Sequence, residues 1–296
     1  VLIARFIADT QGLETRLEQA ASDMAAKGMI SGTKIGTKVL ARGDTILQIA
    51  TGGGTRAQLR EVVEQHFAPS AALLTKGDVP TLGLFISDMD STMIAQECID
   101  ELADFAGLKE KVSAITERAM QGELDFETAL RERVSLLSGL PETAIAECLE
   151  KRITPMLGAR TLVQTLKEKW CKTVLVTGGF HHFADPIAEQ LGFDRVVANR
   201  LAVKNGKLTG EIDGSIVDSG TKLAVLREEK AELDGGSVLA TGDGANDIPM
   251  LEAADYGIAY KAKPKARAAA SGWVDDGPLT TILELFDIHE DKWLND

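Results

Sequence analysis

The chain has 296 residues, of which 44% are hydrophobic and 26% are charged, so it is long enough for one large globular domain and a smaller one. A net charge of −13 argues against nucleic acid or an anionic membrane as a partner, because both need clustered lysine and arginine. No apolar run reaches the ~18 residues of a membrane span, and we expect no signal segment before the first strand. Neither a disulfide framework nor a zinc site is indicated, and a reducing cytoplasm is expected, because the cysteines are odd in number and scattered: Cys98, Cys148 and Cys171.

Residues 1–80 are predicted to form a small α+β domain of their own. Apolar alternation and helical spacing indicate the order strand, helix, strand, strand, helix, strand over residues 1–9, 13–28, 36–41, 44–51, 56–67 and 71–75. This order resembles that of the ACT domains, which bind ligands or dimerise. The resemblance implies a regulatory or dimerisation module, and with it a homodimer. The stretch 76–83 is the predicted linker.

From residue 82 onward, apolar β-branched runs alternate with helical patterns. The predicted strands are 82–87, 172–177, 194–199, 237–242 and 256–260, and helices are predicted at 183–192, 221–233 and 248–255. Continuous apolar strands between helices imply a Rossmann-like, doubly wound parallel sheet that is covered on both faces. In such α/β sheets the ligand site lies beyond the carboxyl ends of the strands.

Two segments interrupt this alternation. Residues 95–155 contain several helical patterns and no convincing strand, so they are predicted to form an all-helical cap insert. Residues 200–217 carry Asn205-Gly206 between alternating runs, which is the strongest short-range signal for a β-hairpin. The hairpin is expected to be a second, smaller flap.

The stretch FISDMDSTMIAQE ends a predicted strand with two carboxylates, Asp88 and Asp90. Side chains two positions apart leave a strand on the same side, and two close carboxylates repel unless a cation neutralises them or one holds a proton. A helix N-cap or an Asx turn explains one aspartate but not both. The pair therefore indicates a metal site or an acid–base site.

Three further segments place polar groups at the same edge of the sheet. Thr177, Gly178 and Gly179 lie near the end of the run VLVTGGF and offer a hydroxyl and backbone N–H groups for phosphate oxygens. Lys222 lies near the start of a helix, although a lone lysine there is more often a solvated surface residue. The turn GDGAND adds three polar side chains, Asp243, Asn246 and Asp247. Such an oxygen-rich site beside phosphate suits Mg²⁺, and its carboxylates can attack phosphorus and move protons.

The motifs DMDST, TGG, Lys222 and GDGAND resemble, in order and position, those of the haloacid-dehalogenase-like (HAD) phosphohydrolases. Within that superfamily, the stretch DMDSTMIAQECIDELA, the helical insert and the hairpin after VVAN are most similar to the phosphoserine phosphatase family. The resemblance implies a phosphatase domain over residues 81–296. It also implies the hydrolysis of O-phospho-L-serine to L-serine and phosphate through an aspartyl phosphate, as the last step of serine biosynthesis.

The same resemblance implies a role for each motif residue. Asp88 is the nucleophile, and Asp90 is the general acid and base. Mg²⁺ is held by Asp88, the backbone carbonyl of Asp90 and Asp243, with Asp247 supporting nearby. The phosphoryl group is bound and oriented by Thr177, Gly178, Lys222 and Asn246. The family usually has serine where this chain has Thr177, and threonine keeps the hydroxyl.

Selection of phosphoserine needs a cation for its carboxylate and an anion for its ammonium, and the resemblance assigns these roles to Arg133 and Glu97. Leu130 and Arg133 share an apolar helix face with Phe126, where an arginine is either paired or snorkels to water, whereas Arg131 is better placed for solvent. Glu97 alone equally suits the favourable dipole of a helix start. Two residues resemble apolar groups that line the family's substrate pocket, although core packing explains them equally well: Met120 and Phe126.

Some alternatives remain beside this interpretation. Gly52-x-Gly54-x-x-Ala57 approximates a dinucleotide fingerprint, but no acidic residue ends a following strand, so a glycine-rich strand-to-helix turn is preferred. His181-His182 is predicted to begin a helix and not to bind metal, because adjacent helical residues point about 100° apart. A phosphotransferase that passes the phosphoryl group to an alcohol such as homoserine, or a phosphatase for another small phosphomonoester such as phosphohomoserine, shares every motif.

Overall fold

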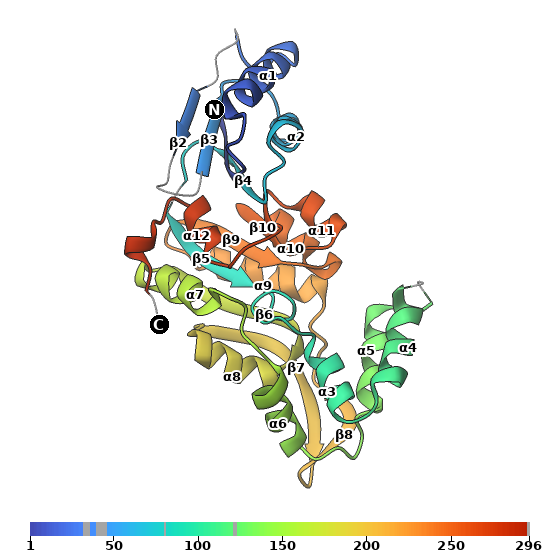
Figure 1. The fold of residues 1–296 in the computed structure, drawn as a ribbon. Helices are drawn as coiled ribbons and strands as arrows, with labels where there is room; N and C mark the ends of the chain where they lie inside the picture. The colour runs from blue at the N-terminus through green and yellow to red at the C-terminus, as the bar shows by residue number, and fades with distance from the viewer. Residues whose placement is uncertain (32–35, 40–45, 80, 121–122, 295–296) are drawn as a thin grey trace.

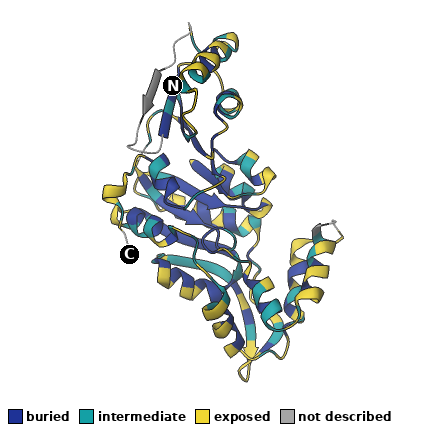
Figure 2. Ribbon diagram, in the orientation of Figure 1, coloured by how far each residue is buried: buried dark blue, intermediate teal, exposed yellow. Residues whose placement is uncertain are grey.

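The protein is described by a computed structural model that covers residues 1–31, 36–39, 46–79, 81–120 and 123–294. Its centre is one eleven-stranded sheet of order β2-β3-β1-β4-β11-β10-β9-β5-β6-β7-β8 (Figure 1). Figure 2 shows that buried residues concentrate in the central strands, whereas helices α4 (Lys109–Met120) and α5 (Phe126–Ser135) are mostly exposed or intermediate. Among the described residues, no helix is both long and apolar enough to cross a membrane.

The N-terminal part has the predicted βαββαβ order and lies at the top of Figure 1. Its strands pair antiparallel, and α1 and α2 pack against each other. The predicted glycine-rich turn leads into α2, where Thr55 and Gln58 form a capping box, and Gly54 has a φ of +86° that favours glycine. Residues 40–45, which include the end of the predicted strand 36–41 and the start of the predicted strand 44–51, lie outside the described part. The elements are β1 (Leu2–Ile7), α1 (Leu13–Ala26), β2 (Gly36–Val39), β3 (Ile46–Thr51), α2 (Arg56–Phe67) and β4 (Ala71–Lys76).

The N-terminal strands join the parallel strands of the second region through a short strand that the sequence patterns did not predict. This strand, β11 (Gly272–Val274), pairs parallel with β10 on one side and antiparallel with β4 on the other. Buried Trp273 lies in the junction, and the guanidinium carbons of Arg60 and Arg267 are 4.6 Å and 4.5 Å from its ring centroid. The two predicted regions therefore share one continuous sheet, and the predicted linker 76–83 overlaps the ends of β4 and β5 (Leu82–Ser87).

The second region contains the predicted doubly wound parallel sheet. Neighbouring side chains of β5 alternate between its faces: Phe85 packs into one core, and Leu84 and Ile86 pack into the other. Helices α7, α8 and α12 contribute to the first core, and α9, α10 and α11 to the second. The elements are α7 (Ala159–Glu168), β6 (Lys172–Phe180), α8 (His181–Leu191), β7 (Arg195–Lys204), α9 (Ser219–Ala231), β9 (Ser237–Gly242), α10 (Ile248–Ala253), β10 (Tyr256–Tyr260), α11 (Pro264–Ala269) and α12 (Thr281–Leu285), with short 3-10 helices η1 (Ala245–Asp247) and η2 (Glu290–Lys292).

The helical cap and the hairpin flap are present as predicted and contact each other. The cap consists of α3 (Cys98–Phe105), α4, α5 and α6 (Thr143–Arg152), and the flap pairs the end of β7 with β8 (Lys207–Asp213). Asn205 and Gly206 form the flap's turn with φ of 52° and 71°, as a two-residue hairpin turn requires. Gly210 of the flap permits close approach to the cap, since a Cβ there would lie 3.1 Å from the backbone oxygen of Ser135. Cap and flap therefore pack against each other at the β8 edge of the sheet.

Candidate active site

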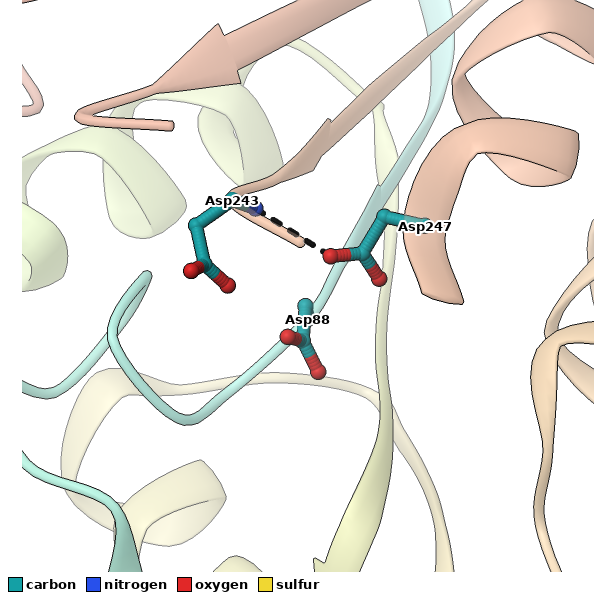
Figure 3. Close-up of side chains that lie close together, drawn as sticks. All are labelled: Asp88, Asp243 and Asp247. Atoms are coloured by element: carbon teal, nitrogen blue, oxygen red, sulfur yellow. Dashed lines mark hydrogen bonds between the residues drawn. The ribbon is translucent and has the colours of Figure 1, made fainter. Parts of the chain in front are cut away.

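Three strand ends bring the predicted polar residues together. Asp88 directly follows β5, Thr177 lies in the last part of β6, and Asp243 directly follows β9, and these are adjacent parallel strands. Asp88, Asp243 and Asp247 each offer a carboxylate oxygen within 4.8 Å of the other two (Figure 3). All three side chains are buried, so the cluster can hold a cation that is shielded from bulk water.

Lys222 of α9 lies against this cluster and is only 1% exposed, so it is not the solvated lysine of the alternative interpretation. Its Nζ donates to Asp88 Oδ1 at 2.6 Å and to Asp247 Oδ1 at 2.7 Å. Burial lowers the pKa of Lys222, but the two carboxylates outweigh it and raise the pKa above its usual value. The lysine therefore stays charged and offsets one of the three carboxylates.

In the turn GDGAND, the side chain of Asp247 accepts hydrogen bonds from the backbone of its own loop. Asp247 Oδ2 accepts from the backbone N–H of Asp243 at 3.1 Å and of Gly244 at 3.0 Å. A Cβ at Gly242 would lie 2.4 Å from Asp247 Cγ, so only glycine permits this approach. Burial and then Asp247 raise the pKa of Asp243 to about 6, which reflects a carboxylate cluster short of positive charge. An all-carboxylate set of this kind fits a hard divalent cation.

Asp90 lies beside the cluster without joining it through its side chain. Its Oδ1 accepts from the backbone N–H of Cys98 at 3.0 Å, and its Oδ2 lies 3.4 Å from the hydroxyl oxygen of Thr177. Burial and then the charge of Glu97 raise the pKa of Asp90 to about 6. A carboxyl group with this pKa can hold or release a proton near neutral pH.

Glu97 and Arg133 from the cap line the same cavity, of about 220 Å³, as Asp88, Asp90 and Thr177. Glu97 is exposed and accepts from the hydroxyl of Ser91 at 2.8 Å. Arg133 is half-buried, as its helix position predicts. Burial lowers the pKa of Arg133, and two carboxylates, those of Asp100 and Glu97, oppose the shift.

Other residues of the cap fit the sequence-based expectations in part. Arg131 is exposed and pairs with Glu127. Phe126 lines the cavity but is 43% exposed, so it is not a core residue, whereas Leu130 is buried. The side chain of Met120 lies outside the described part of the structure. His181 begins α8, as predicted, and its Nδ1 lies 2.7 Å from Asp185 Oδ1.

Gly178 and Asn246 complete the predicted set, since both line the cavity. They also line a neighbouring cavity of about 640 Å³ beside Phe126 and Lys222. Lys263 was not predicted from the sequence, although it lines the smaller cavity and has its Nζ 3.9 Å from Asp243 Oδ2. Its position after β10, the strand beside β9, is the signal that could have found it.

The chain matches the haloacid dehalogenase-like hydrolase family over residues 85–252. It is 49% identical over 212 residues to a phosphoserine phosphatase of Lactococcus lactis, a match that covers 71% of this chain and 98% of that protein.

Two solved structures extend this likeness. A HAD family hydrolase from Salmonella enterica serovar Typhi has a TM-score of 0.82 at 27% identity and covers 98% of this chain and 100% of its own. A phosphoserine phosphatase solved as a phospho-aspartyl intermediate analogue has a TM-score of 0.63 at 40% identity and covers 69% of this chain and 98% of its own. The chain therefore belongs to the haloacid dehalogenase-like hydrolases, within the phosphoserine phosphatase family.

Proposed function

We propose that this protein is a Mg²⁺-dependent phosphatase that hydrolyses O-phospho-L-serine to L-serine and phosphate. The observation that carries the proposal is one cavity in which Asp88, Asp90 and Thr177 lie with Glu97 and Arg133. The first three suit the chemistry of a phosphate ester, and the last two suit the ammonium and the carboxylate of an amino acid. The relatives named phosphoserine phosphatase support the same substrate.

In the proposed first step, a carboxylate oxygen of Asp88 attacks phosphorus, and the bond from phosphorus to the serine oxygen breaks. Asp90 gives its proton to the leaving oxygen, so serine departs as the neutral alcohol. The product on the enzyme is an aspartyl phosphate. Lys222, which already lies 2.6 Å from Asp88, offsets the charge of the transferring group.

In the second step, the Asp90 carboxylate takes a proton from water, whose oxygen attacks phosphorus. The bond between phosphorus and Asp88 breaks, which releases phosphate and restores both aspartates. A pKa of about 6 suits Asp90 to both duties, since it is close enough to neutral pH to exchange its proton in each turnover. Thr177, Gly178 and Asn246 orient the phosphoryl oxygens throughout.

We assign Mg²⁺ to the carboxylate cluster, with Asp88, Asp243 and the backbone carbonyl of Asp90 as its ligands and Asp247 in support. When bound, the ion neutralises charge on the phosphoryl group and on the aspartates around it. Asp247 suits the supporting role, because both of its oxygens already accept hydrogen bonds, one from Lys222 and the other from backbone N–H groups.

Phosphate release from a panel of phosphomonoesters tests the proposal, with Mg²⁺ and with a chelator. Asp88→Asn is expected to lower phosphoserine turnover by about 10³-fold or more, because the amide cannot form the acyl phosphate. Asp185→Asn is the matched control, since its side chain is 53% exposed. Turnover that survives chelation, or that persists in Asp88→Asn, contradicts the mechanism. Formation of phosphohomoserine after addition of homoserine would instead identify a phosphotransferase.

For residues 1–80 we propose a regulatory or dimerisation module. Its support is the βαββαβ order with two helices packed together. Light scattering of the full chain measures its mass, and calorimetry with serine measures ligand binding. A monomer that binds serine only at the active site would contradict both roles. We also propose that the protein acts in the reducing cytoplasm, which suits its three buried free cysteines.

A further inference from the structure

The strand that carries Thr177 and Gly178 bulges away from its neighbour. β6 and β7 pair in parallel at Val176 and Val197, and the pairing resumes at Phe180 and Asn199. Three residues of β6, 177–179, therefore lie opposite one residue of β7. A bulge re-aims its side chains and takes its backbone groups out of the regular ladder, so those groups need other partners.

The side chain of Asn199 supplies one of these partners. Asn199 is 1% exposed, and its Nδ2 donates to the backbone oxygen of Gly178 at 2.7 Å. Its Oδ1 accepts from the backbone N–H of Val217 at 2.8 Å. One partner accepts and the other donates, which defines the orientation of the amide. The side chain thus connects the bulge to the base of the flap.

The Gly178–Gly179 peptide is held on both sides. Asn199 donates to its carbonyl oxygen, and its N–H donates to the Thr177 hydroxyl oxygen at 2.9 Å. Because the Thr177 hydroxyl accepts this bond, its own proton points elsewhere, toward Asp90 or a substrate oxygen. The orientation of that peptide therefore sets the direction in which Thr177 donates.

The other hydrogen bond of Asn199, from the backbone N–H of Val217, joins it to the segment that precedes Lys222. Val217 precedes Asp218, the N-cap of α9, whose Oδ1 accepts from the backbone N–H of Thr221 at 2.8 Å. The backbone N–H of Lys222 donates to the backbone oxygen of Asp218 at 3.0 Å, so Lys222 lies in the first turn of this capped helix. Asn199 is thus hydrogen-bonded to the segment before Lys222 as well as to the bulge.

We propose that Asn199 is a positioning residue of the phosphate site, which keeps the bulge 177–179 at a fixed spacing from the start of α9. Thr177, Gly178 and Lys222 then converge on the oxygens of one phosphoryl group. This inference rests on the proposed function, because it assigns the phosphoryl group to that site. In this role Asn199 does not contact the substrate itself.

Direct binding of inorganic phosphate in the presence of Mg²⁺, measured by calorimetry, tests the inference. Asn199→Leu has a similar volume and removes both hydrogen bonds without adding charge. We expect it to bind phosphate about tenfold more weakly, which corresponds to about 1.4 kcal/mol. Its affinity for Mg²⁺ alone should stay within about twofold of the unmodified protein, since Asn199 contacts none of the three clustered aspartates in the described hydrogen bonds. Asn199→Ala serves if the leucine variant does not fold.

Thr173→Val is the matched control for loss of stability. Thr173 lies at the other end of β6, is buried, and exchanges hydrogen bonds with Asp194 at 2.9 Å and 3.1 Å. The Thr173→Val substitution should lower the free energy of unfolding and leave the affinity for phosphate unchanged. Wild-type phosphate affinity in a folded Asn199 variant, or an equal loss in Thr173→Val, overturns the inference. An unmodified protein that neither binds phosphate nor hydrolyses phosphoserine overturns the proposed function instead.

Discussion

Replacing Lys222 by methionine removes the ammonium that donates to both Asp88 and Asp247, while the chain stem keeps a similar length. Both carboxylates are buried, at 4% and 0% exposure, so water cannot replace the lost bonds. Removal of one partner from a buried ion pair costs about 3–5 kcal/mol, because a charge stays buried without compensation. We therefore expect Lys222→Met to lower the free energy of unfolding by about 3–5 kcal/mol at pH 7 in the presence of a chelator.

Urea unfolding gives this free energy by linear extrapolation. Lys230→Met is the matched control on the same helix. Lys230 pairs with Asp255 at 2.8 Å, but the two side chains are 42% and 38% exposed, so the loss should stay below about 1 kcal/mol. Adding Asp88→Asn to Lys222→Met should recover at least about 1 kcal/mol, since it removes one uncompensated charge.

The prediction would be refuted if Lys222→Met lost no more stability than Lys230→Met. It would also be refuted if Asp88→Asn destabilised the Lys222→Met background further. Either result would mean that the carboxylates do not depend on the lysine for their compensation. Adding Mg²⁺ to Lys222→Met should raise its stability, because the ion compensates the same carboxylates.

Three further predictions concern other parts of the chain. Arg133→Ala should lower kcat/KM for phosphoserine roughly 10–100-fold but change turnover of a small aryl phosphate little. Arg131→Ala should affect neither substrate, because Arg133, and not Arg131, is among the described residues that line the cavity with Asp88. Glu229 is buried between the cations of Lys172 and Arg195. Burial raises the pKa of Glu229, but the two cations outweigh it and lower the pKa below 4.5. Glu229→Gln should therefore lose most stability above pH 4.5, and the loss should shrink as pH falls below that value in urea unfolding. Trp170 is 93% exposed with a φ of 63°, so Trp170→Gly should raise the free energy of unfolding by about 1 kcal/mol.

For each of these three predictions, a specific experimental result would contradict it. Equal losses of Arg133→Ala on phosphoserine and on an aryl phosphate would return the arginine to a structural role. A stability loss in Glu229→Gln that stays constant from pH 7 to pH 3 would mean that ionisation of the carboxyl does not matter. A glycine at position 170 that destabilises the protein would show that the indole ring contributes more than the backbone conformation costs.

The elements that the sequence predicted well are those with local causes. The Asn205-Gly206 hairpin follows from turn chemistry, and the strands of the parallel sheet follow from continuous apolar runs. The conformation of the acidic turn GDGAND also has a local cause, since the Asp247 side chain accepts hydrogen bonds from the backbone of its own loop. These features depend on residues within a few positions of each other, so the sequence pattern alone carries the information.

The sequence also predicted which strand ends meet, because parallel connectivity brings carboxyl ends to one edge of the sheet. It did not predict β11, which has three residues and exists because β4 and β10 lie on either side of it. Lys263 was missed for a related reason, since its 3.9 Å distance to Asp243 depends on which strands are neighbours.

The sequence by itself determined the doubly wound sheet, the cap, the flap and most of the polar residues at the sheet edge, although not Lys263. Only the tertiary structure decided how those residues are buried and paired. Lys222 and Asp88 are 134 positions apart, and Asn199 reaches Gly178 and Val217 from a different strand. The energy of a charge or an amide depends on its surroundings, and distant segments supply those surroundings only after the chain has folded.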